Sequence, residues 1–245
     1  MYHRIIDFSY TFQDVIYTLY ADTLRSCCMI IDLTLPVYPG MPVYPGDSNV
    51  VFRPALVHEK DGFSVHELRM GTHTGTHIDA PCHSDPHGAP ADAPEVLDAC
   101  VGDAVLIDIS MRLRGNKILL QHLETALSSI PQGGRVLIAT GWSSRFGNEN
   151  YYTCHPSLSD EVADELIRRE IRLLGIDMPS LHITRDDVIH DKLLSAGIVI
   201  VESLTNLAAL KKRHVFFSAA PLRLLGLDGS PVRAYAVVPN ECTHG

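Results

Sequence analysis

The 245-residue chain has 29 acidic and 20 basic residues, a net charge of −9, and 46% hydrophobic residues, which together predict a single domain with a sizeable core. The acidic balance, without a long Lys/Arg patch, argues against nucleic acid as a partner. Six cysteines without a C-x-x-C pair are typical of reduced thiols, and the sequence has neither a membrane-length apolar run nor a secretory signal, so we expect a cytoplasmic protein without a membrane partner.

The N-terminal part of the chain differs in composition from the remainder. Residues 1 to 28 are rich in aromatics without a clear period, and we interpret them as an N-terminal extension of unknown role ahead of a domain at 29–245. A buried strand is expected at 29–35. Between residues 36 and 47 the Tyr-Pro-Gly unit occurs twice, and such a rigid turn can hold an aromatic ring in place. Tyr44 therefore either lines a pocket or only packs the turn.

Strand-like segments at 50–57 and 63–70 lead into a stretch that is dense in metal-ligand types. Within eleven residues the chain carries His73, His77, Asp79 and His83. Imidazole and carboxylate suit zinc or manganese, and a catalytic site needs about three protein ligands with one position left for water. The alternative is an exposed polar loop without a metal.

The spacing of these residues constrains the local backbone. A straight strand rises ~3.3 Å per residue, so its ends at His73 and Asp79 would lie ~20 Å apart, too far for one ion. The chain must therefore bend. Gly75 can take backbone conformations closed to other residues, and Pro81 stops a regular helix or central strand. We expect a compact loop.

Beyond the cluster, strands alternate with helices, which predicts an α/β class. A helical turn is expected at 95–99, strands at 101–110, 135–140, 173–177, 198–202, 214–220 and 232–238, and helices at 117–129, 159–169 and 187–196. Trp142 follows a strand end, where functional loops gather, so it either contacts substrate or packs in the core. Glu202 closes an otherwise apolar strand and needs a metal or basic partner nearby. His190, on the preceding helix, pairs with it as a remote ligand candidate.

A metal at this cluster could polarise a carbonyl oxygen and lower the pKa of a bound water towards ~7, and both effects serve carbonyl hydrolysis. An amide also needs its leaving nitrogen protonated. His83, which Pro81 separates from the tighter triplet, is the candidate proton carrier. Asp79 could bridge two ions if His190 and Glu202 supply the further ligands.

The run His73-Thr-Gly-Thr-His-Ile-Asp-Ala-Pro-Cys-His83 resembles the H-x-G-T-H-x-D-x-P-x-H signature of the cyclase family of metal-dependent hydrolases, which includes bacterial kynurenine formamidases and isatin hydrolases. Supporting resemblances lie at 44–47, 140–142, 175–180 and 225–233. The resemblance implies a single-domain swivelling β/β/α fold that assembles as a homodimer or homotetramer. In the formamidase branch a tryptophan often stands where this chain has Tyr44.

The formamidase branch also implies a ligand set and a mechanism. Two zinc ions would be held, the first by His73, His77 and Asp79 and the second by Asp79, His190 and Glu202. His83 corresponds to the general acid/base. The substrate would be a small-molecule amide, N-formyl-L-kynurenine or a similar aryl formamide, hydrolysed to the amine and formate by a metal-bound hydroxide.

Two alternatives remain open at this point. One keeps the class and changes the reaction to the opening of a cyclic amide or lactone with a single manganese, as in isatin hydrolase. The other is a non-catalytic small-molecule-binding protein in which a metal only staples the loop.

Overall fold

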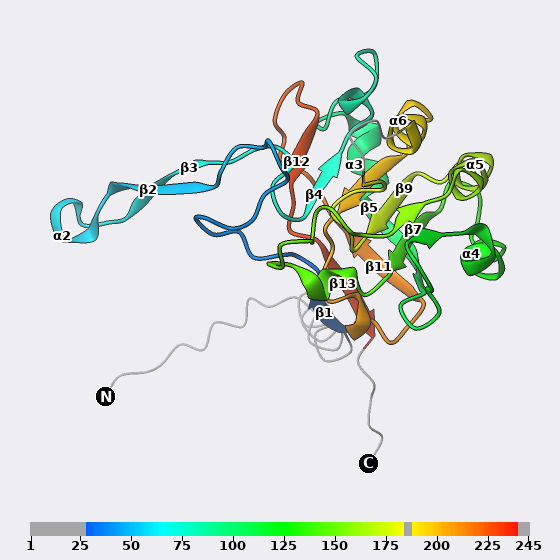
Figure 1. The fold of residues 1–245 in the computed structure, drawn as a ribbon. Helices are drawn as coiled ribbons and strands as arrows, with labels where there is room; N and C mark the ends of the chain where they lie inside the picture. The colour runs from blue at the N-terminus through cyan, green and yellow to red at the C-terminus, as the bar shows by residue number, and fades with distance from the viewer. Residues whose placement is uncertain (1–27, 184–187, 240–245) are drawn as a thin grey trace, which may run out of the picture.

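A computed structural model describes residues 28–183 and 188–239, and its centre is a nine-stranded mixed sheet (Figure 1). The predicted N-terminal extension, apart from residue 28, lies outside the described residues. Across the sheet the strands follow one another as β1 (Cys28–Asp32), β13 (Tyr235–Pro239), β11 (His214–Ser218), β5 (Val101–Asp108), β7 (Arg135–Ala139), β9 (Leu173–Ile176), β10 (Val199–Glu202), β4 (His77–Asp79) and β12 (Gly229–Pro231).

The middle of the sheet is parallel and buried on both faces. Strands β5, β7, β9 and β10 pair in parallel. Successive side chains of β5 point to opposite faces of the sheet and enter two hydrophobic clusters. Val105 and Ile107 belong to the first cluster, and Ala104 and Leu106 belong to the second. The first cluster includes residues of α4 (Leu120–Leu127), α5 (Asp160–Arg168) and α6 (Val188–Ser195), and the second includes residues of α3 (Pro94–Cys100). This arrangement confirms the predicted α/β class.

Each predicted strand and helix has a counterpart in the described part of the chain, usually a shorter one. The helix expected at 117–129 begins only at Leu120, because Lys117–Ile118 forms β6 and pairs with β8 (Ser157–Leu158). Ser159 occupies the N-cap position of α5 without a side-chain capping hydrogen bond. Among the described residues, no helix combines the length and the apolar character needed to span a membrane.

Strands β2 (Val51–Leu56) and β3 (Val65–Arg69) form an antiparallel hairpin that reaches away from the main sheet (Figure 1). The short helix α2 (His58–Asp61) lies at its tip. Phe63, Val65 and Leu68 expose 56%, 41% and 57% of their surfaces. A two-stranded hairpin of this kind is only marginally stable by itself in water.

The His/Asp stretch adopts a bend followed by a strand. Gly75 has φ of 64°, in the left-handed region, and makes the turn that the spacing requires. The prediction of a compact loop is wrong for the second half, because His77–Asp79 continues as β4 between β10 and β12. Pairing on both sides satisfies the backbone of this buried segment and sets Asp79 opposite Ile200.

Candidate metal centre

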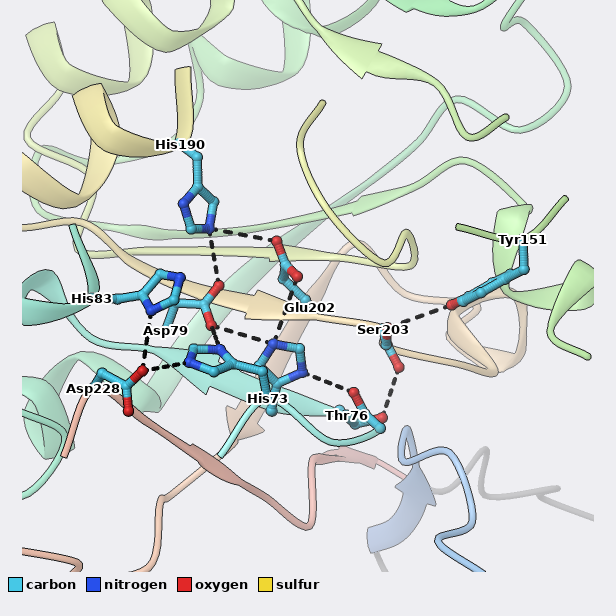
Figure 2. Close-up of polar contacts among 11 residues, drawn as sticks. His73, Thr76, Asp79, His83, Tyr151, His190, Glu202, Ser203 and Asp228 are labelled. Atoms are coloured by element: carbon cyan, nitrogen blue, oxygen red, sulfur yellow. Dashed lines mark hydrogen bonds and ion pairs between the residues drawn. The ribbon is translucent and has the colours of Figure 1, made fainter. Parts of the chain in front are cut away.

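Five predicted ligand residues, drawn from three separate segments of the chain, converge beside β4. Figure 2 labels His73, Asp79, His190 and Glu202 among them. They form two groups of three, and within each group the candidate ligand atoms lie within 4.8 Å of one another. The first group is His73, His77 and Asp79, and the second is Asp79, His190 and Glu202. Asp79 is therefore the residue that the two groups share.

The buried carboxylates face the imidazole nitrogens directly. Asp79 Oδ1 lies 2.5 Å from His73 Nδ1 and 3.3 Å from His77 Nε2, and its Oδ2 lies 3.1 Å from His190 Nε2. Glu202 Oε2 lies 3.6 Å from His77 Nε2, and its Oε1 lies 3.7 Å from His190 Nε2. Both carboxylates can thus meet the same ring nitrogens from two sides.

The electrostatics of this cluster favour a cation. Burial opposes ionisation of Asp79, but the neighbouring His77 and His73 and the hydrogen bond with His190 lower its pKa well below the usual value. Burial also opposes protonation of His73, yet Asp79 and Asp228 raise its pKa to about 9. No Lys or Arg is among the described residues that line the cavity here. Three imidazoles and two buried carboxylates form a donor set that fits zinc or manganese.

Side-chain hydrogen bonds hold the strands that carry these groups. Thr76 Oγ1 donates to Ser203 O at 2.7 Å and accepts from Leu35 N at 2.9 Å. Ser203 follows Glu202 and has φ of 55°, a strained value for a residue other than glycine. Tyr151 Oη donates to Ser203 Oγ at 3.4 Å (Figure 2). These contacts connect the segment before β4 to the end of β10 and hold the ligand candidates of the two strands close together.

A cavity of about 460 Å³ opens beside the cluster, a size suited to a small molecule. Its lining includes all five ligand candidates and His83, whose side chain is 34% exposed. The lining also contains Tyr44 and Tyr152, whose rings meet edge to face with centroids 5.7 Å apart. Tyr44 therefore lines the pocket, the first of the two roles considered for it.

Trp142 is not among the residues that line this cavity. The side chain is buried in the hydrophobic cluster that includes α4, α5 and α6, and its indole N–H donates to Tyr151 O at 2.9 Å. This placement does not support the expectation that Trp142 contacts substrate, because the indole ring is packed in the hydrophobic core. Tyr152, ten residues further along the chain, faces the cavity instead.

Asp228 is a site residue that the sequence reasoning missed. Its Oδ2 lies 2.9 Å from His73 Nε2 and 3.2 Å from His83 Nδ1 (Figure 2). The residue falls within the segment 225–233 that supports the family resemblance, but one carboxylate in a glycine-rich turn shows no spacing that connects it to the cluster. It reaches the site because β12, which begins at the next residue, pairs with β4.

We predict that Gly229→Ala disturbs His73. A Cβ at this position would lie 2.5 Å from Ile78 O and 2.9 Å from His73 Cε1, so the strand or the ring must shift. We expect the free energy of unfolding to fall by about 1–3 kcal/mol and metal affinity to fall with it. Thermal unfolding and metal titration check this. Gly71→Ala is the matched control, because its Cβ would make only ordinary contacts at 3.7 Å or more; equal behaviour of the two variants would contradict the prediction.

Comparison with known proteins identifies the family to which this fold and site belong. Residues 31–182 match the family model described as "Putative cyclase". The chain belongs to this cyclase family.

Individual relatives include a kynurenine formamidase, an isatin hydrolase and a protein described as a metal-dependent hydrolase. Kynurenine formamidase of Bacillus cereus is 35% identical over 213 residues, which cover 83% of this chain and 95% of the relative. Isatin hydrolase A from Labrenzia aggregata, solved with benzyl benzoate, has a TM-score of 0.79 and 26% identity, covering 92% of this chain and 100% of that one. A structure described as a "predicted metal-dependent hydrolase" from Bacillus stearothermophilus has a TM-score of 0.72 and 28% identity, covering 86% and 98%.

Proposed function

We propose that the protein is a metal-dependent hydrolase that cleaves the carbon–nitrogen bond of an aryl formamide, with N-formyl-L-kynurenine as the first candidate substrate. One cavity brings together the features that carry this proposal. They are the two candidate ligand groups that share Asp79, the His83 side chain, and an aromatic wall formed by Tyr44 and Tyr152. The 35% identity to a kynurenine formamidase supports the choice of substrate.

The proposed metal complement is two zinc ions, with manganese as the alternative. His73, His77 and Asp79 would hold one ion, and Asp79, His190 and Glu202 the other. When bound, such ions supply a Lewis acid for the formyl oxygen and a water of lowered pKa. The lowered pKa of Asp79 keeps this carboxylate negatively charged beside the imidazoles of His73, His77 and His190.

The remaining steps fall to other side chains of the cavity. Tyr44 and Tyr152 take the aryl ring and orient the formyl group towards the ligand cluster. His83, with its ring centroid 5.5 Å from that of His190, carries the proton that the departing arylamine needs. Its partial exposure lets it exchange that proton with water for the next turnover.

The direct test is release of formate from N-formyl-L-kynurenine by the purified, zinc-loaded protein. A chelator-treated sample is the control, and activity should return when zinc is restored. Turnover no higher than in the chelator-treated control would exclude this substrate. The same outcome with every carbonyl substrate would favour a protein that only binds its ligand.

A second candidate is the opening of a cyclic amide with a single manganese, favoured by the likeness to isatin hydrolase A at a TM-score of 0.79. The two proposals differ at the second ligand group. Under the formamidase proposal, His190→Ala lowers the bound metal from two equivalents per chain to one. A count that starts near one equivalent and stays there, with turnover of isatin, would favour the alternative.

We predict that Tyr44→Ala weakens binding of aromatic substrates. An aromatic contact between Tyr44 and the substrate ring would contribute about 0.5–1.5 kcal/mol, so its loss should raise KM for an aryl formamide roughly 2- to 13-fold with kcat little changed. Steady-state kinetics on aryl and short aliphatic formamides measure this. Tyr38→Ala is the matched control from the first Tyr-Pro-Gly unit, because Tyr38 does not line the cavity. An equal rise in KM for both substrates, or for both variants, would contradict the assignment.

We also propose a homodimer or homotetramer. The projecting β2–β3 hairpin supports it, since its exposed Phe63, Val65 and Leu68 lack a covering layer within the described chain. Light scattering on the eluted protein should give a multiple of the 27.0 kDa chain mass. Leu68→Glu should lower that mass while thermal unfolding of the main domain persists, and a wild-type mass of one chain would overturn the proposal.

A further inference from the structure

Asp228 takes no part in the proposed mechanism, yet one of its carboxylate oxygens contacts both kinds of functional histidine. Oδ2 lies 2.9 Å from Nε2 of His73, a ligand candidate, and 3.2 Å from Nδ1 of His83, the proton carrier (Figure 2). The other oxygen accepts a hydrogen bond from Thr72 Oγ1 at 3.2 Å. The rings of His73 and His83 lie with centroids 4.2 Å apart on this shared carboxylate.

On the His73 side, the contact has the geometry of an outer partner of a metal ligand. Nδ1 of His73 lies 2.5 Å from Asp79 Oδ1, within the ligand cluster, while Nε2 faces Asp228. His77 likewise has one ring nitrogen towards the ligand cluster and the other towards an outer acceptor. Its Nε2 faces Asp79, and its Nδ1 lies 2.9 Å from Gly75 O. A ligating histidine usually donates its other N–H to a carboxylate or carbonyl, which fixes the tautomer and the ring orientation.

On the His83 side, the same oxygen determines which ring nitrogen can transfer a proton in the cavity. A neutral imidazole has one N–H and one lone pair. When Nδ1–H donates to Asp228, Nε2 is the nitrogen left to exchange a proton in the cavity that His83 lines. Without that acceptor the ring is free to rotate and to change tautomer.

Asp228 directly precedes β12, the strand that pairs with β4 and its ligand candidates. Asp228 O accepts a hydrogen bond from Ala80 N at 2.9 Å, directly after β4. The next residue, Gly229, is paired with Asp79 in the β4–β12 register. These two contacts tie the backbone at Asp228 to β4, which fixes the distance from the Asp228 carboxylate to His73 relative to Asp79.

We propose that Asp228 is a positioning residue that, through one carboxylate oxygen, orients His73 for metal binding and holds His83 in the Nδ1–H tautomer. The His83 part rests on the proposed function. The metal-binding part does not depend on the identity of any substrate.

The test uses the full-length protein and the variants Asp228→Asn and Asp228→Ala, with Asp103→Asn as the matched control. Asp103 is an exposed residue of β5, so its substitution removes the same charge away from the site. Zinc affinity is measured by competition with a chelator. We expect both Asp228 variants to bind zinc about 10- to 100-fold more weakly, and the control to stay within about twofold of wild type.

A second measurement reads the tautomers by long-range proton–nitrogen NMR on the zinc-loaded protein, with His73→Gln and His83→Gln assigning the signals. We expect Nδ1–H for His83 in the wild type and a mixture of tautomers in Asp228→Ala. A wild-type His83 protonated on Nε2 overturns the proposal even if no variant folds. Folded Asp228→Ala with unchanged zinc affinity, or with an unchanged His83 tautomer, overturns it as well.

These readouts separate failure of the inference from failure of the proposed function. Neither zinc affinity nor the tautomer requires turnover, so an inactive wild-type protein would reject the substrate and leave both measurements decisive. If the wild type does hydrolyse the formamide, Asp228→Asn should lower kcat roughly 10- to 100-fold with KM unchanged, because the aromatic wall of the cavity stays intact.

Discussion

Asp79→Asn is expected to abolish metal binding in both ligand groups and to lower kcat/KM by about a thousandfold or more. Asp79 is the residue that the two groups share, and only 1% of its surface is exposed. A neutral amide in its place binds a cation weakly and leaves the ring nitrogens of His73, His77 and His190 without their common anionic partner. Metal analysis of the purified variant and a formate-release assay measure both effects.

The control for this substitution is Asp103→Asn, which removes one negative charge at an exposed position of β5. It should keep the metal content and activity of the wild type. Thermal unfolding of chelator-treated wild type and variant separates loss of metal from loss of fold. An Asp79→Asn protein that retains two equivalents of metal, or a tenth of wild-type activity, would contradict the bridging role.

His83→Gln is expected to lower kcat about 10²- to 10⁴-fold while the metal content stays at the wild-type value. The glutamine side chain keeps polarity and similar size but cannot transfer a proton. His83 lies outside the two ligand groups that share Asp79, although with His73 and Asp228 it forms a third group whose nitrogen and oxygen atoms also lie within 4.8 Å. Metal content therefore decides between a proton carrier and a ligand.

The matched control is His87→Gln, an exposed histidine four residues further along the chain. It should leave both kcat and metal content within about twofold of wild type. Loss of one metal equivalent in His83→Gln would reassign His83 as a ligand. Unchanged kcat with full metal content would remove it from the mechanism altogether.

Much of the candidate site could be predicted because its signals are local or terminate a clear strand. His73, His77 and Asp79 lie within seven residues, and the chain between them must bend at Gly75 for all three to reach one ion. Glu202 stands out as a charge at the end of an apolar strand, and the observed register sets it opposite His77. The parallel strands are recognisable from continuous apolar runs, which burial on both faces requires.

Other parts of the site depend on tertiary contacts that carry no local pattern. Strand β12 has three residues, Gly-Ser-Pro, too few and too polar to show a period, so the approach of Asp228 could not be anticipated. The three residues of β4 are likewise defined by their neighbours on both sides. Trp142 and Tyr152 are both aromatic residues in the segment that follows β7, and only the packing of the core decides which one reaches the cavity.

The position of β4 also has a consequence for how the chain folds. His190 and Asp79 are 111 residues apart in sequence, and His73 and Asp228 are 155 apart, yet each pair is in hydrogen-bond contact. Contacts of such long range form late, because the entropy of closing the intervening loop must be overcome first. A nascent chain that ends before α6 contains the local His73-His77-Asp79 triplet but neither His190 nor Glu202. The second candidate ligand group can therefore assemble only after β10 has paired with β4, so a metal bound there would stabilise the folded sheet.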